Sequence, residues 1–191
     1  FVVVYVLLPI IFQEVHMNKL QENLVSTRRI FDGKIINLRI DTVTLPNGKE
    51  AKREIVEHPG AVAVVPLLPD GRIIMVRQYR HAVGKALLEI PAGKLDRGEI
   101  PEQCAARELE EETGYACNQL RSLTSVWTTP GFSDEIIHIY AAENLQKKVQ
   151  NLDEDEFLQI EIYSKEQLRQ MMQDGSISDS KTIIGLCLAG I

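Results

Sequence analysis

The chain has few cysteines and fewer basic than acidic residues. Each of these shortages argues against a class of protein. Its three cysteines among 191 residues are odd in number and have no Cys-x-x-Cys spacing, which argues against a disulfide framework and structural zinc. A reducing cytoplasm therefore fits the composition best. The formal net charge of −6 argues against a nucleic-acid partner, because proteins that track phosphates usually carry a basic surface.

Long apolar runs are also lacking. Residues 1–12 are almost wholly apolar, but this is shorter than the roughly 20 residues that a membrane span needs, so no membrane partner is expected. Neither a basic segment before this run nor a small-residue cleavage site after it supports a signal peptide. We interpret residues 1–16 as an apolar extension or mis-assigned start ahead of Met17. A packed N-terminal strand is the alternative.

What is present predicts a small β unit followed by a larger domain. Hydrophobic residues form 45% of the chain, enough for one sizeable core. Residues 17–58 form the predicted β unit: residues 35–43 alternate apolar and polar side chains, and Asn47-Gly48 is a strong hairpin signal. Residues 59–191 form the predicted main domain. Its apolar run 61–68 and the strand 72–79, joined by a tight turn, imply a central sheet.

The remaining pattern predicts a mixture of strands and a few helices. Further strands are expected at 87–90, 120–127, 136–142 and 157–163, and helices at 101–113, 165–173 and 180–188. Pro101 suits a first helical turn, and Gly114 suits a left-handed C-terminal cap. Because strands and helices do not alternate strictly, we expect an α+β fold, an α/β/α sandwich with a mixed sheet behind the small antiparallel unit.

The helix at 101–113 carries an unusual concentration of acid. Glu108, Glu111 and Glu112 stand at positions i, i+3 and i+4, so their carboxylates share one face. They repel one another and crowd the end of the helix that the dipole makes unfavourable for acids. Mg²⁺, with Mn²⁺ as the alternative, removes this conflict and binds through a few carboxylates plus substrate phosphates. The competing interpretation is a solvated acidic face.

A wider pattern decides between these interpretations. A glycine is followed after five residues by a glutamate, and after seven more by an Arg-Glu pair that leads into the acidic patch. The fixed positions are Gly93, Glu99, Arg107, Glu108, the apolar Leu109, Glu111, Glu112, Gly114 and the apolar Tyr115. This pattern resembles the Nudix box, the motif of the Nudix hydrolases. The resemblance implies a sandwich fold and hydrolysis of a substituted nucleoside diphosphate by attack of water on phosphorus.

The resemblance also assigns roles within the motif. The metal ligands it implies are Glu108, Glu112 and the backbone carbonyl of Ala92. Glu111 belongs to the catalytic set as a ligand or as the partner of one. Structural roles fall to Gly93, Glu99, Arg107 and Gly114. Glu99 and Arg107 are expected to join the loop to the helix, and contact of Arg107 with substrate is the alternative.

Residues outside the motif narrow the substrate. Pro130 lies sixteen residues beyond Gly114, and a proline at this distance resembles the ADP-ribose pyrophosphatases of the family. The similarity covers about residues 22 to 188 and implies cleavage of ADP-ribose to AMP and ribose 5-phosphate. One rival is a broader pyrophosphatase acting on other nucleoside diphosphate sugars. The other is a module that binds ADP-ribose without cleaving it, although such modules normally lose acids from the glutamate-rich helix.

Substrate contacts are expected from five side chains. Arg53 and Arg80 are suited to adenine stacking and diphosphate contact, since guanidinium is planar and a fork donor. Surface salt bridges are the alternative for both arginines. Glu54 and Glu135 are suited to accept hydrogen bonds from ribose hydroxyls or purine amino groups. Phe132 could pack against the terminal ribose or only within its own turn.

The acidic loop 153–156 supplies the base that water attack requires. Glu154 and Glu156 are two residues apart, so both can point toward one site while Asp155 points away. By resemblance Glu154 is the general base and Glu156 a further metal ligand. A solvated acidic loop is the alternative.

The small β unit is expected to act in a homodimer. Isolated hairpins are marginally stable in water, so this unit needs a partner surface. In the enzymes that the chain resembles, such a unit exchanges between subunits. We therefore expect Arg53 or Glu54 to serve the site of the partner subunit.

Overall fold

The computed structural model describes residues 20–152 and 156–191. They divide into a first unit, described over residues 20–58 and 131–133, and a second unit that holds the rest from Pro59 onward. The segment 1–16, expected to be an extension, lies outside the described residues. Within the described ranges, no helix has the length and apolar character that crossing a membrane requires.

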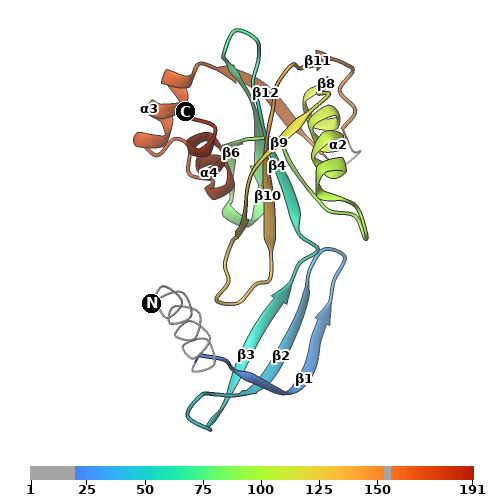
Figure 1. The fold of residues 1–191 in the computed structure, drawn as a ribbon, viewed down its shortest axis with the longest axis vertical. Helices are drawn as coiled ribbons and strands as arrows, with labels where there is room; N and C mark the ends of the chain where they lie inside the picture. The colour runs from blue at the N-terminus through green and yellow to red at the C-terminus, as the bar shows by residue number, and fades with distance from the viewer. Residues whose placement is uncertain (1–19, 153–155) are drawn as a thin grey trace, which may run out of the picture. The chain divides into compact units, whose positions relative to one another are not determined.

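The first unit is a three-stranded antiparallel sheet in the order β1-β2-β3 (Figure 1). Its strands span Asn23–Asp32, Asn37–Thr44 and Glu50–Glu57. Gly48, in the predicted hairpin turn, has φ 81°, a conformation that costs glycine little. Strand β1 is exposed along its whole length. Its uncovered large apolar side chains are Leu24, Val25, Ile30 and Phe31.

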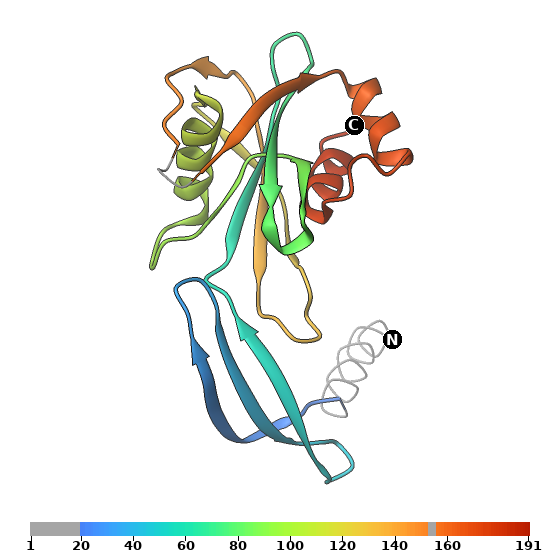
Figure 2. The same cartoon turned by 180° about the vertical axis from the view of Figure 1, so that it is seen from behind.

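The second unit contains two main sheets, which cross near the centre of this unit in Figures 1 and 2. One is mixed, in the order β7-β4-β10-β9, with β4 parallel to β10 and the other pairs antiparallel. Its strands span Ala92–Lys94, Ala61–Pro66, Ile136–Ala142 and Leu120–Trp127. The other is antiparallel, in the order β12-β5-β6, with strands at Leu158–Tyr163, Ile73–Arg80 and Lys85–Glu89. A separate ribbon pairs β8 (Tyr115–Ala116) with β11 (Gln146–Lys147).

Strands β4 and β5 depart from the expectation of one central sheet. The tight turn at Pro69-Asp70-Gly71 between them implies a central sheet that contains both strands. Only an isolated bridge between Leu67 and Ile73 joins them, and beyond it β4 and β5 enter different sheets. The partners that separate them, β10 and β12, lie far along the chain, so the local pattern carried no signal of the division.

Helices cover both sides of these sheets. Helix α2 (Pro101–Thr113) lies on one side, and α3 (Lys165–Gln173) and α4 (Ser180–Leu188) lie on the other, as both views show (Figures 1 and 2). A short 3₁₀ turn, η1 (His81–Val83), follows β5. This arrangement confirms the predicted α/β/α sandwich.

Strand β4 shows why its sequence is apolar throughout. Val62 and Val64 are buried in the core beneath α2, whereas Ala63 and Val65 are buried in the core beneath α4. Successive side chains of a strand point to opposite faces, so a strand covered on both faces needs apolar residues at every position.

The helix ends follow local sequence signals. Pro101 occupies the first turn of α2, and Gly114 ends that helix with φ 68° while its amide donates to the carbonyl of Glu110. Ser164 and Gln167 form a capping box at the start of α3. Asp179 caps α4 by accepting the amide of Thr182. These signals explain both ends of α2 and the first residues of α3 and α4.

Candidate active site

Helix α2 carries the glutamates of the motif at the surface of the second unit. Ala105 and Leu109 are fully buried against the sheet, so the helix is held by one face. Glu108, Glu111 and Glu112 share another face of the helix, as the predicted i, i+3, i+4 spacing requires. Rigid docking of the apolar face therefore determines where the carboxylates stand.

Glu112 is the most deeply placed of the three. Only 1% of the residue is exposed, and its Oε2 accepts a 3.0 Å hydrogen bond from the backbone amide of Ala92. Burial, followed by the charges of Glu156 and Glu108, raises the pKa of Glu112 to about 9. The single amide does not offset these effects, so an anionic Glu112 requires added positive charge nearby.

Glu108 occupies space that Gly93 leaves open. Gly93 lies in β7, opposite Val62 of β4, and a Cβ atom built on it would overlap the Glu108 carboxylate. The backbone of Gly93 is not in the left-handed region, so its lack of a side chain, not its conformational freedom, is what the position uses. Burial raises the pKa of Glu108 as well, and the charges of Glu111 and Glu156 add to this effect.

Arg107 connects the glutamates to the preceding loop. It donates to both carboxylate oxygens of Glu99 at 3.0 Å, and its Nη1 donates to Glu108 at 2.7 Å and to Glu111 at 2.9 Å. Glu99 also accepts the amide of Asp96 at 3.0 Å, which closes the loop on itself. One guanidinium thus ties the loop to two of the acids on the helix.

The Arg107–Glu99 pair predicts a specific acid sensitivity. Its hydrogen bonds lower the pKa of Glu99 from 4.5 to about 2. The stabilisation is complete above the unfolded-state pKa of about 4.5 and is lost as the pH falls toward 2. We expect Glu99→Gln to lose less stability than the wild type between these pH values in urea unfolding. Glu110→Gln, which changes an exposed acid of the same helix, is the control and should retain the wild-type pH profile. Parallel pH profiles for wild type and Glu99→Gln would contradict the assignment.

The donor set suits a hard divalent cation. Glu108 and Glu112 offer carboxylate oxygens, and Glu156 lies close enough for its charge to raise the pKa of both. Within the described ranges, no three acidic, histidine or cysteine side chains already form a metal cage. Arg107 holds Glu108 and Glu111, and Mg²⁺ takes few protein ligands beside water and substrate phosphate. One buried and one partly buried acid, both with raised pKa values, are therefore the feature that fits a cation.

The predicted substrate residues fall in both units. Arg80 and Glu135 belong to the second unit, whereas Arg53, Glu54 and Phe132 belong to the first. Arg80 forms two 2.8 Å hydrogen bonds with Glu89, and Glu135 accepts a 2.7 Å hydrogen bond from Thr128.

In the first unit, Arg53 forms an ion pair with Glu22, and the Phe132 carbonyl accepts the amide of Val56 at 2.7 Å. Glu54 is exposed on β3. Arg53 therefore makes a salt bridge, the alternative that the sequence left open for it. The role of Glu54 in substrate binding stays a prediction.

The acidic loop is only partly described. Glu156 lies beside the helix glutamates, whereas Glu154, the predicted general base, falls outside the described residues. Sequence reasoning also missed two charged groups at the site, Glu89 and Lys181, which are joined by a hydrogen bond. Their separation along the chain is 92 residues, and no spacing rule links positions so far apart.

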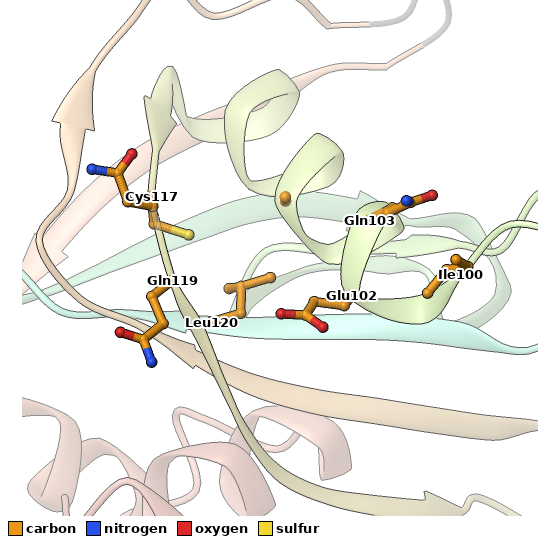
Figure 3. A pocket seen from close by; sticks show the side chains of 8 residues that line it. Ile100, Glu102, Gln103, Cys117, Gln119 and Leu120 are labelled. Atoms are coloured by element: carbon orange, nitrogen blue, oxygen red, sulfur yellow. The ribbon is translucent and has the colours of Figure 1, made fainter.

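The described residues of the second unit line surface cavities that include the following two. One, of about 430 Å³, borders Glu156 and is lined in part by Arg77 and Phe157. The other, of about 410 Å³, lies between the first turns of α2 and the segment 117–120 (Figure 3). Glu102 and Gln103 line it, and none of the predicted site residues does. Of these two cavities, the one lined by Glu156 adjoins the acidic site.

Comparison with known families agrees with this geometry. The NUDIX domain matches residues 57–183, and the chain therefore belongs to this family. The nucleoside diphosphate sugar hydrolase N-terminal domain matches residues 22–56. The two matches meet at the end of β3, close to the boundary between the two structural units.

Individual relatives make the placement more specific. The chain is 49% identical over 173 residues to a methanol dehydrogenase activator of Bacillus methanolicus, covering 89% of this chain and 94% of the relative. It is 46% identical over 168 residues to an ADP-ribose pyrophosphatase of Bacillus subtilis, covering 87% and 91%. A crystal structure titled ADP compounds hydrolase superposes with a TM-score of 0.79 at 22% identity, covering 90% of this chain and 94% of that one. This last similarity supports the fold.

Proposed function

We propose that this protein is a metal-dependent hydrolase that cleaves the diphosphate of ADP-ribose to AMP and ribose 5-phosphate. The observation that carries the proposal is a pair of carboxylates on α2, the buried Glu112 and the partly buried Glu108, held beside the β7 backbone at Ala92 and Gly93. Acids that repel one another in a partly desolvated site require a cation to remain ionised, and Mg²⁺ favours sites in which it also binds phosphate oxygens. The relative from Bacillus subtilis is named an ADP-ribose pyrophosphatase.

The residues divide the chemistry between them. The proposed cation ligands are Glu108, Glu112, Glu156 and the carbonyl of Ala92, with Mg²⁺ as the ion and Mn²⁺ as its substitute. When bound, such an ion neutralises diphosphate charge and makes water more acidic. Glu154 is the proposed general base, and Glu111 is a ligand or the partner of one. Arg80 contacts the diphosphate through the part of its guanidinium that Glu89 does not use.

The decisive experiment is hydrolysis of ADP-ribose in ¹⁸O-labelled water, with and without Mg²⁺. We expect AMP and ribose 5-phosphate only with the ion, and mass spectrometry of the two products locates the phosphorus that water attacks. EDTA is the control, and Mn²⁺ tests the substitute ion. Binding of ADP-ribose without any cleavage under these conditions would contradict the proposal and favour a binding module.

A substrate panel tests the breadth of the site. Another relative, 36% identical over 149 residues and covering 73% of this chain and 78% of its own length, is a GDP-mannose pyrophosphatase of Yersinia enterocolitica. We expect kcat/KM to be highest for ADP-ribose in a panel that includes GDP-mannose. Equal values for both substrates would favour a broader nucleoside diphosphate sugar pyrophosphatase.

A second candidate function is activation of a methanol dehydrogenase. The supporting observation is the 49% identity to the Bacillus methanolicus activator over 94% of its length. The test adds this protein to a purified methanol dehydrogenase and measures the dehydrogenase rate. Stimulation that Glu112→Gln abolishes would connect this function to the same carboxylates.

A homodimer formed through the first unit is also proposed. Strand β1 leaves the large apolar side chains of Leu24, Val25, Ile30 and Phe31 exposed, and an isolated three-stranded sheet cannot cover them. Analytical ultracentrifugation should give about twice the chain mass of 21.5 kDa. Val25→Asp should weaken association by about tenfold or more, because it buries a charge in the interface. Val149→Asp, at an exposed valine of the second unit, is the control, and a fully active wild-type monomer would contradict the proposal.

The proposed compartment is the cytoplasm. Cys104, Cys117 and Cys187 are all free thiols. Burial raises the pKa of Cys104 to about 12, so this thiol stays protonated and unreactive. Free thiols are usual where glutathione and thioredoxin maintain reduction.

A further inference from the structure

Four charged side chains form a network where helix α4 begins. Glu89, the last residue of β6, has 1% of its surface exposed. Arg80 donates to both of its oxygens at 2.8 Å, and Lys181 donates to Oε2 of the same carboxylate. Lys181 also lies 3.1 Å from Asp179. Two acids and two cations therefore balance one another around a buried carboxylate.

Lys181 is more than a surface lysine. Its side chain is only 11% exposed, which is uncommon for this residue type unless it is paired. A buried carboxylate is costly without compensating charge. Without Lys181, Arg80 would be the cation that compensates Glu89 by itself. Because Lys181 and Arg80 together offset Glu89 and Asp179, the network carries no net negative charge toward the acidic site.

Helix α4 holds Lys181 in a defined place. The hydroxyl of the buried Thr182 accepts the amide of Ile90 at 3.0 Å and donates to Asp179 at 2.6 Å. A Cβ atom added to Gly185 would stand 2.9 Å from Ile90 and 3.1 Å from Val65, so the helix approaches the sheet closely. The first turn of α4 is therefore attached directly to the end of β6.

Arg80 connects this network to the candidate active site. The Arg80 guanidinium and the Glu112 carboxylate lie close enough for the charge of each group to affect the pKa of the other. Its side chain remains 38% exposed. Among the described residues its Nη1 has no hydrogen-bond partner, while Nε and Nη2 are bound to Glu89. The free nitrogen is thus the part of the guanidinium that an anionic oxygen can reach.

We propose that Lys181 is a positioning residue that, through Glu89, keeps Arg80 in place to bind a diphosphate beside Glu112. This inference rests on the proposed function, because it supplies a cation for the same diphosphate. The structural basis is the shared carboxylate: Lys181 occupies one side of Glu89, so that carboxylate holds Arg80 in a bidentate geometry without a surplus of negative charge. Without Lys181, Glu89 and Asp179 would repel the substrate and draw Arg80 inward.

A double-mutant cycle tests whether Lys181 acts through Arg80. Lys181→Met should raise KM for ADP-ribose by about tenfold, the effect of weakening one charge-assisted contact, and should change kcat by less than about threefold. Arg80→Met should raise KM at least as much. In the Arg80→Met background, Lys181→Met should add less than about twofold, because both changes remove the same contact. Lys165→Met on α3 is the matched control and should match the wild type.

Two further measurements separate positioning from loss of folding. Lys181→Arg keeps the charge and should restore KM to within about threefold of the wild type. Calorimetric binding of ADP-ribose in EDTA, which requires no turnover, should show the same weakening for Lys181→Met. If that variant does not fold, as judged by circular dichroism, Lys181→Gln replaces it with the same expectation. Multiplicative effects of the Lys181 and Arg80 variants, or a wild-type KM in Lys181→Met, would overturn the inference.

Failure of the proposed function has a different outcome. A wild-type protein that neither binds nor cleaves ADP-ribose would remove that function. The cycle is then measured by binding of inorganic pyrophosphate. Weakening of about tenfold by Lys181→Met would support the positioning role, and unchanged binding would overturn it.

Discussion

Glu112→Gln is expected to reduce Mg²⁺-dependent turnover of ADP-ribose by about 10³-fold, which corresponds to about 4 kcal/mol of lost transition-state stabilisation. Glutamine has the shape of glutamate and can still accept the Ala92 amide that Glu112 binds at 3.0 Å. It lacks the charge that binds a cation. The measurement is kcat under saturating substrate across a series of Mg²⁺ concentrations. The double variant Glu108→Gln/Glu112→Gln should also lose Mg²⁺ affinity in calorimetry.

The same substitution should have the opposite effect on stability in the absence of metal. Glu112 is buried, and the charges of Glu156 and Glu108 disfavour its anionic form. Glutamine needs neither to bury an anion nor to take up a proton on folding, so in EDTA the midpoint of thermal unfolding should rise by about 2 to 4 °C, or about 1 kcal/mol for a chain of this size. Glu110→Gln on the exposed side of α2 should change neither quantity. Unchanged turnover and unchanged Mg²⁺ affinity in the double variant would remove the metal site.

Much of the fold could be predicted because its signals are local. Pro101, Gly114 and Ser164 act on the backbone within one turn of where they stand, so the bounds of α2 and α3 follow from the sequence. The continuous apolar run of β4 likewise reports burial on both faces.

Strand pairing was harder to predict because it depends on distant partners. Pro91-Ala92-Gly93 reads as the turn that closes the predicted strand 87–90, but Ala92–Lys94 forms β7 and pairs with β4 from Ala61 to Ala63. Nothing in a Pro-Ala-Gly-Lys segment distinguishes a turn from a short edge strand, since β structure is stabilised by its neighbours. That pairing is important for the site, because it brings Ala92 and Gly93 to Glu112 and Glu108.

The residues of the candidate site also differ in whether a local sequence signal or a distant contact brings them together. The helix spacing identified Glu108 and Glu112, and Arg107 stands next to them in the chain. Glu89 and Lys181 could not be identified as a pair, because their contact requires α4 to fold back onto β6. Charge balance around a buried carboxylate becomes visible only when the tertiary structure shows which cations surround it.

Gly93→Ala is expected to reduce kcat/KM for ADP-ribose by about 10²-fold, the usual cost of moving a catalytic group by about an ångström. The added methyl would overlap the Glu108 carboxylate, which is the flexible end of a side chain. The protein can therefore fold by moving Glu108, and the free energy of unfolding should change by less than about 1 kcal/mol. Turnover across a Mg²⁺ series, together with urea unfolding in EDTA, measures both effects.

The comparison that makes this test specific is Gly131→Ala. A Cβ atom at Gly131 meets nothing within 4 Å, and Gly131 is not in the left-handed region, so that variant should retain wild-type stability and turnover. Glu108→Gln combined with Gly93→Ala should be no less active than Glu108→Gln alone, because the methyl then displaces a group that no longer binds the cation. A Gly93→Ala protein with wild-type activity would show that Glu108 can bind a cation from another position. Additive losses in the double variant would show instead that the methyl acts on the β7 backbone. Either result would separate the role of Gly93 from the position of Glu108.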